Sequence, residues 1–139
     1  LRQLREQGLK VNFLSGDGSL DPAIVTTAGG PQFVEGAYMT SVREARNIAS
    51  SQEVVKKMKE AGFDPSGFTL YAYAALEAIA ASMNGAKTGD GMKLAEWLKA
   101  HTVPTVLGPK TWDAKGDLNE TSFSLFVWGS DGNYTEMQK

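Results

Sequence analysis

The segment that most constrains how this chain can fold is the run from Phe68 to Met83, which few polar side chains interrupt. It is too short and too polar to span a bilayer, and it predicts a helix from Phe68 to Asn84 that ends at Gly85. Because apolar residues occur on nearly every side of this helix, it should be buried on several sides. Burying one Leu or Phe side chain contributes roughly 1.5–3 kcal/mol, so the helix needs neighbours that cover it.

The sequence before this helix predicts alternating strands and helices. Residues 10–14 and 34–40 have the apolar character of short strands. Between them, Asp21 is placed to cap a helix with Pro22 in its first position, and Gly29 is placed to end it. This alternation is typical of a parallel α/β sheet.

The middle of the chain predicts three helices with no strand between them. Ser50 and Glu53 match a capping box at the start of the first helix. The apolar helix follows, and Asp90 is placed to cap a third helix that runs to about His101. Three successive helices do not continue the earlier strand–helix alternation.

The end of the chain predicts extended structure. Pro104 and Pro109 exclude a helix around them. Side chains alternate from Phe123 to Trp128 as in a strand, and Asp131-Gly132 is typical of a tight hairpin turn. The chain thus offers about four strands, and none is placed to cover the apolar helix. We therefore expect a piece of a longer protein whose missing part precedes Leu1.

The residue inventory excludes several kinds of chemistry. A net charge of −2 without a block of like charges argues against nucleic-acid binding. There is no cysteine, and the acidic residues lack metal-binding spacing. His101, the lone histidine, is placed at a helix end, and no Gly-x-Ser-x-Gly motif accompanies it. The sequence therefore predicts no enzyme, no metal and no cofactor.

One candidate binding residue follows from position. Asp17 comes just after a predicted strand and lies between Gly16 and Gly18. In open parallel sheets, ligands bind outside the carboxyl ends of strands. A carboxylate there suits a primary ammonium group, and the glycines let a ligand approach closely. The alternative is a turn aspartate that accepts hydrogen bonds from its own backbone.

Several stretches follow one another in a characteristic order over essentially the whole chain. They are Leu14–Gly18 (LSGDG) with Asp21-Pro22, Ala28–Gly30 through Glu35-Gly36, Leu70–Ala75 (LYAYAA), Thr105–Leu118 (TVLGPKTWDAKGDL), and Phe126–Trp128 with Asp131-Gly132. In this order and spacing the chain resembles the branched-chain amino acid binding proteins of ABC importers, which belong to the type I periplasmic binding protein family.

The resemblance implies an α/β fold of two lobes joined by three crossovers, which close on a ligand by a hinge motion. This chain would supply parallel βαβ elements, three helices and a C-terminal β-hairpin. Residues 1–44 would belong to the second lobe. Residues 45–103 would be helices of the first lobe, whose sheet would lie upstream. Residues 104–139 would cross back and complete the second lobe.

The resemblance also implies a function: capture of an aliphatic, branched-chain amino acid for import. Asp17 would hold the ligand's α-ammonium group, and Phe68, or Tyr71 if the alignment shifts, would line the pocket for its side chain. The groups that hold the α-carboxylate would lie outside this chain. The partners would be the amino acid, the membrane permease and the missing N-terminal part. The location would be the periplasm or, in Gram-positive bacteria, the outer face of the membrane.

Other interpretations remain open at this point. The same fold could bind an amide, urea or an aromatic acid, although Asp17 would repel an aromatic carboxylate. It could also serve as a sensory domain joined to a membrane or DNA-binding segment. A small α/β hydrolase that uses His101 is a third interpretation.

Overall fold

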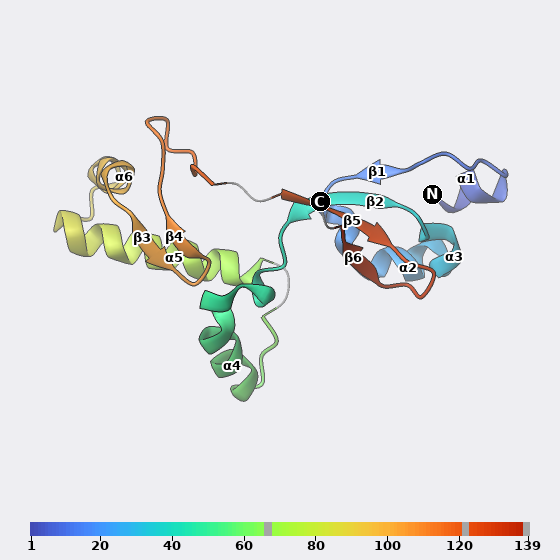
Figure 1. The fold of residues 1–139 in the computed structure, drawn as a ribbon, viewed down its shortest axis with the longest axis horizontal. Helices are drawn as coiled ribbons and strands as arrows, with labels where there is room; N and C mark the ends of the chain where they lie inside the picture. The colour runs from blue at the N-terminus through green and yellow to red at the C-terminus, as the bar shows by residue number, and fades with distance from the viewer. Residues whose placement is uncertain (66–67, 121–122, 138–139) are drawn as a thin grey trace. The chain divides into compact units, whose positions relative to one another are not determined.

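The computed structural model describes residues 1–65, 68–120 and 123–137. The chain divides into two compact units (Figure 1). Unit 1 consists of Leu1–Arg43 and Ser122–Lys139, and unit 2 consists of Glu44–Thr121. Each unit has its own cluster of buried apolar side chains.

Unit 1 is built on a four-stranded mixed sheet with the strand order β1-β2-β5-β6. Its strands are β1 (Leu14–Ser15), β2 (Tyr38–Val42), β5 (Phe123–Trp128) and β6 (Tyr134–Glu136). Strand β1 is parallel to β2, whereas β5 is antiparallel to both β2 and β6. The parallel pair β1–β2 and the terminal hairpin β5–β6 therefore meet at the β2–β5 pairing.

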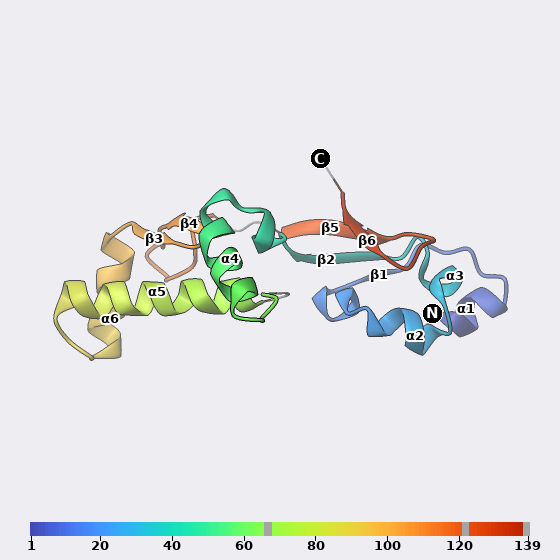
Figure 2. The same cartoon turned by 90° about the horizontal axis from the view of Figure 1, so that it is seen from below.

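The helices of unit 1 lie on one side of this sheet (Figure 2). They are α1 (Arg2–Glu6), the 3₁₀ helix η1 (Asp17–Leu20), α2 (Ala23–Ala28) and α3 (Pro31–Val34). Along β2 and β5, every second residue faces these helices, because successive side chains of a strand point to opposite faces of the sheet. Met39, Phe126 and Trp128 form the centre of this core together with Val34.

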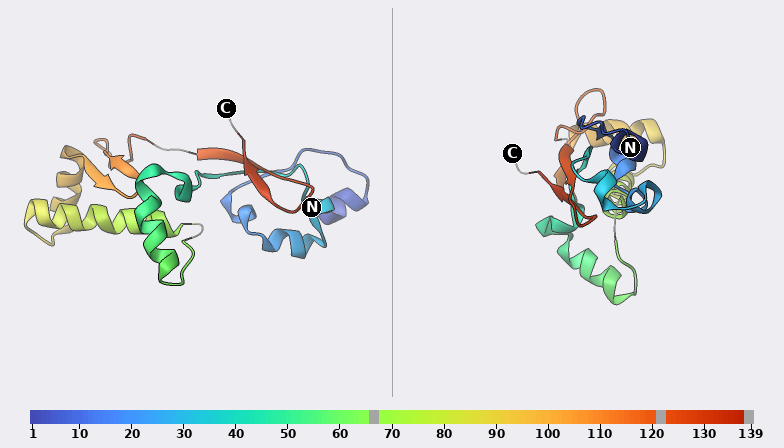
Figure 3. Two further views of the ribbon diagram at one scale, coloured as in Figure 1. Left: turned by 60° about the horizontal axis from the view of Figure 1, so that its bottom comes forward. Right: turned by 90° about the vertical axis from the view of Figure 1, so that its right-hand side faces the viewer.

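No helix of unit 1 lies against the opposite face of the sheet (Figure 3), and apolar residues of three strands lie on that face. Leu14, Tyr38 and Val127 pair in one row across three strands. At the two ends of this face, Leu14 is 65% exposed and Phe123 is 68% exposed. All-parallel sheets normally bury both faces, whereas antiparallel sheets commonly leave one face to solvent, and this mixed sheet contains both kinds of pairing. Within the described residues, unit 1 therefore presents an uncovered apolar sheet face.

Unit 2 consists of helices and one small hairpin. Its helical elements are η2 (Ala45–Asn47), η3 (Ala49–Ser51), α4 (Gln52–Glu60), α5 (Thr69–Ala86) and α6 (Gly91–Ala100). The hairpin joins β3 (Val103–Thr105) to β4 (Gly108–Lys110). Its core contains Ala45, Val55, Leu70, Ala74 and Val106.

Helix α5 buries one face and exposes another. It contacts α6, β3 and η2. Its buried residues recur every four positions, at Leu70, Ala74, Ala78 and Ser82. The exposed side of α5 carries Leu76, Ile79 and Met83. None of the described helices is long and apolar enough to cross a membrane. The expectation that no strand of this chain covers the apolar helix is wrong for one side, because β3 contacts it, while the side with Leu76, Ile79 and Met83 stays uncovered within the described residues.

The close packing of α5 and α6 depends on Gly85. A Cβ atom at this position would lie 2.3 Å from the Trp97 ring. The sequence predicts that Gly85 ends α5, but the helix continues to Ala86 and ends at Lys87, which has a left-handed φ of 53°. Gly85 is thus a contact position within the helix, and the prediction that it ends the helix is wrong.

The predicted fold class is confirmed, but several element boundaries are wrong. The strand expected at residues 10–14 shrinks to Leu14–Ser15 because it lies at the sheet edge, where only β2 pairs with it. The strand expected at residues 34–40 begins only at Tyr38, because Pro31–Val34 form α3. The capping box is also wrong: the Ser50 hydroxyl donates to the Val106 carbonyl at 2.9 Å.

The structure draws the second boundary between the units later than the sequence places it. The sequence separates residues 45–103 from residues 104–139. In the structure, β3 contacts α5 and pairs with β4. Residues up to Thr121 consequently belong to unit 2. The assignment of the two units to the two lobes of the resembled fold stays a prediction.

Leu70 and Leu76 lie on opposite sides of α5 and provide a matched pair. Leu70 is 0% exposed and Leu76 is 66% exposed. We expect Leu70→Ala to lower the free energy of unfolding of this chain by about 2–5 kcal/mol. Leu76→Ala should change it by less than about 0.5 kcal/mol. Chemical denaturation followed by circular dichroism measures both, and equal losses would contradict the orientation of α5.

The start of unit 2 carries a pH-dependent ion pair. The Glu44 carboxylate accepts hydrogen bonds from Arg46 Nε at 2.9 Å and Arg46 Nη2 at 2.8 Å. These bonds outweigh partial burial and lower the pKa of Glu44 below its ordinary value of 4.5. When folding lowers the pKa of a carboxyl, the ionised carboxylate stabilises the folded state at pH values above the pKa of the unfolded chain. This contribution is lost as the pH falls through the pKa of the folded state.

We therefore expect Glu44→Gln to reduce the loss of stability that the chain shows between pH 7 and pH 3. The difference should be less than about 1 kcal/mol, because the pair is partly exposed to solvent. Unfolding free energies of both proteins at the two pH values measure it. A larger loss in the variant than in the wild type would contradict the assigned direction of the pKa shift.

Candidate functional site

Asp17 is the first residue of η1 and follows the carboxyl end of β1. It is exposed, and no described residue donates a hydrogen bond to its carboxylate or forms an ion pair with it. The alternative that Asp17 accepts bonds from its own turn is therefore wrong. Its carboxylate is available to a group outside the described chain.

The other aspartates differ from Asp17 in this respect. Asp21 accepts from the Ala23 backbone N–H at 2.8 Å, and Asp90 caps α6 by accepting from the Lys93 N–H at 3.0 Å. The other four aspartates also accept hydrogen bonds: Asp64 from Arg46, Asp113 from the backbone N–H groups of 115–117, Asp117 from Lys115, and Asp131 from Asn133. The Asn133 side chain donates to Asp131 and lowers the pKa of that carboxyl. Of the aspartates, only Asp17 lacks a partner among the described residues.

The glycines beside Asp17 are not required by the described structure. Gly16 has an extended conformation, with φ −87° and ψ −171°, and Gly18 is not among the residues with positive φ. A Cβ atom at either position would meet no atom within 4 Å. The local backbone and packing therefore accept a side chain at both positions. Open space on both sides of a carboxylate fits the approach of a ligand or of another part of a longer chain.

The turn that carries Asp17 is held by contacts to Ser19. Ser15 and Ser19 share a hydrogen bond between their hydroxyls at 2.7 Å, and the Ser19 N–H donates to the Gly16 carbonyl at 3.1 Å. From β5, the Trp128 Nε1–H donates to the Ser19 carbonyl at 3.1 Å. Sequence reasoning missed this long-range bond. The strand alternation around Trp128 was the available signal that its ring lies on one face of β5.

Phe68 and Tyr71 lie together at the start of α5 in unit 2. Their rings meet edge to face, with centroids 6.2 Å apart. Phe68 is 54% exposed, whereas Tyr71 packs against the buried core of unit 2. The structure thus brings these two candidates together on one helix end, while Asp17 belongs to the other unit. Their roles in ligand binding stay predictions.

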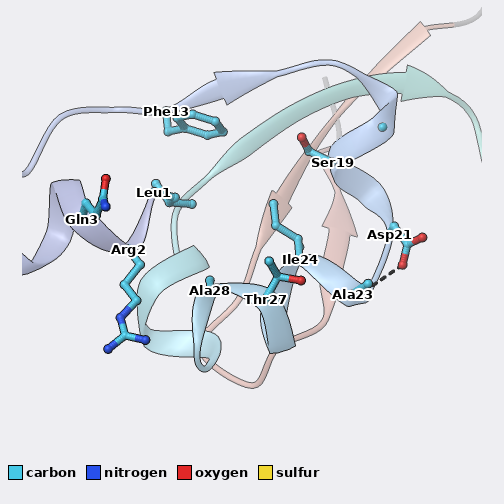
Figure 4. A pocket seen from close by; sticks show the side chains of 11 residues that line it. Leu1, Arg2, Gln3, Phe13, Ser19, Asp21, Ala23, Ile24, Thr27 and Ala28 are labelled. Atoms are coloured by element: carbon cyan, nitrogen blue, oxygen red, sulfur yellow. Dashed lines mark hydrogen bonds between the residues drawn. The ribbon is translucent and has the colours of Figure 1, made fainter.

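A recess of about 690 Å³ lies beside η1 and α2 (Figure 4). Its walls include Leu1, Phe13, Ile24 and Ala28. Asp17 is not among its lining residues, and the Asp21 carboxylate in its wall already accepts from Ala23. The recess is therefore an apolar depression in unit 1 and not the predicted carboxylate site.

The histidine packs on a neighbouring ring, and the acidic residues of the described chain form no metal-binding group. The His101 ring stacks on Trp97 with centroids 4.0 Å apart, and its Nδ1 lies 2.6 Å from the Trp97 carbonyl. No group of three or more His, Asp or Glu side chains within residues 1–65, 68–120 and 123–137 could hold a metal ion. The arrangement around Asp17 offers charge complementarity to a cation.

Comparisons with known proteins give consistent results. The family model described as "Periplasmic binding protein" matches residues 1–133. An "Amino acid binding protein" from Pseudomonas aeruginosa is 46% identical over 137 residues, which are 99% of this chain and 37% of that protein. A "Leu/Ile/Val-binding protein homolog 2" from Brucella abortus is 39% identical over 142 residues, which cover 100% of this chain and 38% of that protein.

A solved structure shares the fold. The leucine-binding protein from Thermotoga maritima superposes with a TM-score of 0.78 at 22% identity, over 99% of this chain and 39% of that chain. This chain therefore spans between 37% and 39% of the length of these three proteins.

Asp17 and Asp113 should respond differently to truncation. Asp113 Oδ1 accepts from the N–H groups of Lys115, Gly116 and Asp117, each at 2.9 Å. We expect Asp113→Ala to lower the free energy of unfolding by about 1–2 kcal/mol, because these donors lose their acceptor. Asp17→Ala should change it by less than about 0.5 kcal/mol. Chemical denaturation tests both, and a large loss for Asp17→Ala would mean that its carboxylate has a structural partner.

Proposed function

The chain belongs to the periplasmic binding protein family, and we propose that it is the C-terminal part of a solute-binding protein that captures a branched-chain amino acid. Such a protein delivers its ligand to an ABC permease in the membrane, from the periplasm or from the outer face of a Gram-positive membrane. The family is one of solute-binding proteins. The proposed function is selective binding of the ligand, in which no covalent bond is made or broken.

One observation carries this proposal: the carboxylate of Asp17 lacks a partner in the described chain, while the other aspartates have one. An ammonium group donates up to three hydrogen bonds and carries the complementary charge. Asp17 stands at the end of a parallel strand, where ligands of α/β sheets bind. We assign Asp17 to the α-ammonium group of an amino acid.

An aliphatic side chain on this ligand needs an apolar surface. Phe68 offers an exposed ring, and Tyr71 supports it from the edge. An aromatic ring buries apolar area without requiring a hydrogen bond from an aliphatic group. The relative from Brucella abortus is named for the binding of Leu, Ile and Val. We assign Phe68, with Tyr71 beside it, to the wall that contacts the side chain of a branched-chain ligand.

Three uncovered apolar surfaces support the presence of an N-terminal part in the complete protein. They are the outer face of the unit 1 sheet, the exposed side of α5, and the recess next to Leu1. Apolar surface gains roughly 25 cal/mol for each Å² removed from water. The relatives are longer proteins, of which this chain spans 37% and 38%. We infer that the preceding part covers these surfaces and supplies the groups that bind the α-carboxylate.

The role of Asp17 is tested in the complete protein with a pair of matched ligands. Leucine carries the α-ammonium group, and 4-methylpentanoate is the same molecule without it. We expect Asp17→Asn to weaken leucine binding by about 10- to 100-fold, because a charge-assisted hydrogen bond is lost. Binding of 4-methylpentanoate should weaken little. Isothermal titration calorimetry measures both affinities.

Asp21→Asn serves as the control, because its carboxylate is a nearby acceptor that already binds the Ala23 N–H. It should leave the ratio of the two affinities unchanged. Equal losses for both ligands in Asp17→Asn would remove Asp17 from the ammonium role. Binding of an amide, urea or benzoate in place of leucine would identify another solute class on the same fold.

A further inference from the structure

We propose that Trp128 is a positioning residue for ligand binding, because its indole N–H fixes the turn that carries the Asp17 carboxylate. This inference rests on the proposed function, since it assigns Trp128 an effect on the ammonium group that Asp17 holds. Trp128 itself does not touch the ligand in this proposal. It acts through the Ser19 carbonyl, which accepts from its Nε1 at 3.1 Å.

The Asp17 carboxylate depends on its turn for its position. No described residue donates to it, so no side-chain contact of its own holds it in place. Its location is therefore set by the backbone of η1. A ligand group that must meet the carboxylate at hydrogen-bond distance is sensitive to small shifts of this backbone.

The hydrogen bonds within η1 are local, although η1 also packs against β2 and its Leu20 contacts the core of unit 1. The Ser19 N–H bonds the Gly16 carbonyl, and the Ser15 and Ser19 hydroxyls bond each other. The bond from Trp128 differs, because its donor is 109 residues away in the sequence and lies on another strand. Among the described residues, it is the side-chain hydrogen bond that ties the turn to β5. The local bonds shape the turn, and the bond from Trp128 acts together with the packing of η1 on β2 to fix its place relative to the sheet.

Trp128 is well suited to hold a fixed position. It is 1% exposed, and the Tyr134 ring meets its ring edge-on with centroids 5.1 Å apart. Its backbone N–H donates to the Ala37 carbonyl at 3.0 Å, and its carbonyl accepts from the Gly36 N–H at 2.9 Å. Strand β5 is paired on both sides, by β2 and by β6. The donor thus belongs to one of the two inner strands of the unit 1 sheet.

The chemistry of the ring gives the proposal a specific signature. A buried indole N–H needs an acceptor, and a phenyl ring in its place keeps aromatic packing but cannot donate. Loss of the donor should loosen the turn and weaken the contact of Asp17 with an ammonium group. Contacts of the ligand's side chain do not depend on this carboxylate. A ligand without an ammonium group should therefore be affected much less.

The test measures leucine and 4-methylpentanoate binding to the complete protein by calorimetry, for Trp128→Phe, Asp17→Asn and the double variant. We expect Trp128→Phe to weaken leucine binding by about three- to tenfold, the effect of one net hydrogen bond, and 4-methylpentanoate binding by less than about twofold. In the Asp17→Asn background, Trp128→Phe should cause no further change in the ratio of the two affinities. This non-additivity shows that Trp128 acts through Asp17.

Two controls separate positioning from general stability. Tyr134→Phe keeps the ring that packs on Trp128 and leaves the bond to Ser19 intact, so it should keep the wild-type affinity ratio. Benzothienylalanine at position 128 keeps the shape of the indole but has sulfur in place of the N–H. It should reproduce the effect of Trp128→Phe even where the phenyl variant folds poorly.

Equal weakening of both ligands, or an unchanged affinity ratio, would overturn the role of Trp128. An equal effect of Trp128→Phe with and without Asp17→Asn would do the same. If Asp17→Asn alters the ratio and the changes at position 128 do not, the proposed function stands and only this inference fails. If Asp17→Asn leaves the ratio unchanged, the ammonium role fails first and the inference fails with it.

Discussion

Strand β5 holds unit 1 together, because it joins the last part of this chain to the first. It pairs with β2 on one side and β6 on the other, and it places Phe126 and Trp128 in the core beneath the helices. The bond from Trp128 to Ser19 extends this connection to the turn after β1. The candidate ligand group, Asp17, therefore stands on a turn that is hydrogen-bonded to a residue from the opposite end of the sequence.

A second feature shapes both units: each buries one apolar surface and leaves another uncovered. In unit 1, helices cover one face of the sheet, while Leu14 and Phe123 remain exposed on the other. In unit 2, α5 buries Leu70 and exposes Leu76. Apolar surfaces of this kind mark interaction sites, and we propose contact with further polypeptide for these surfaces. The greater length of the relatives agrees with this interpretation.

Much of the fold could be predicted, because periodicity and capping are local properties. Asp90 caps α6 as its position predicts, and the end of α2 at Gly29 follows from a left-handed glycine. The errors occurred where distant residues compete with local signals. Ser50 matches a capping box, yet its hydroxyl donates to Val106 from a distant turn. Gly85 resembles a helix stop, yet it accommodates Trp97 within the helix.

The sequence by itself determined the α/β class and the excess of apolar residues in α5, and it named Asp17 as a candidate, because composition, spacing and the position after a strand are visible in one dimension. Only the tertiary structure decided that the Asp17 carboxylate lacks a partner while the other aspartates have one. It also decided that the Trp128 indole N–H donates to the turn that carries Asp17. Hydrogen bonds between segments 109 residues apart depend on how strands pair, and strand pairing leaves no local pattern in the sequence.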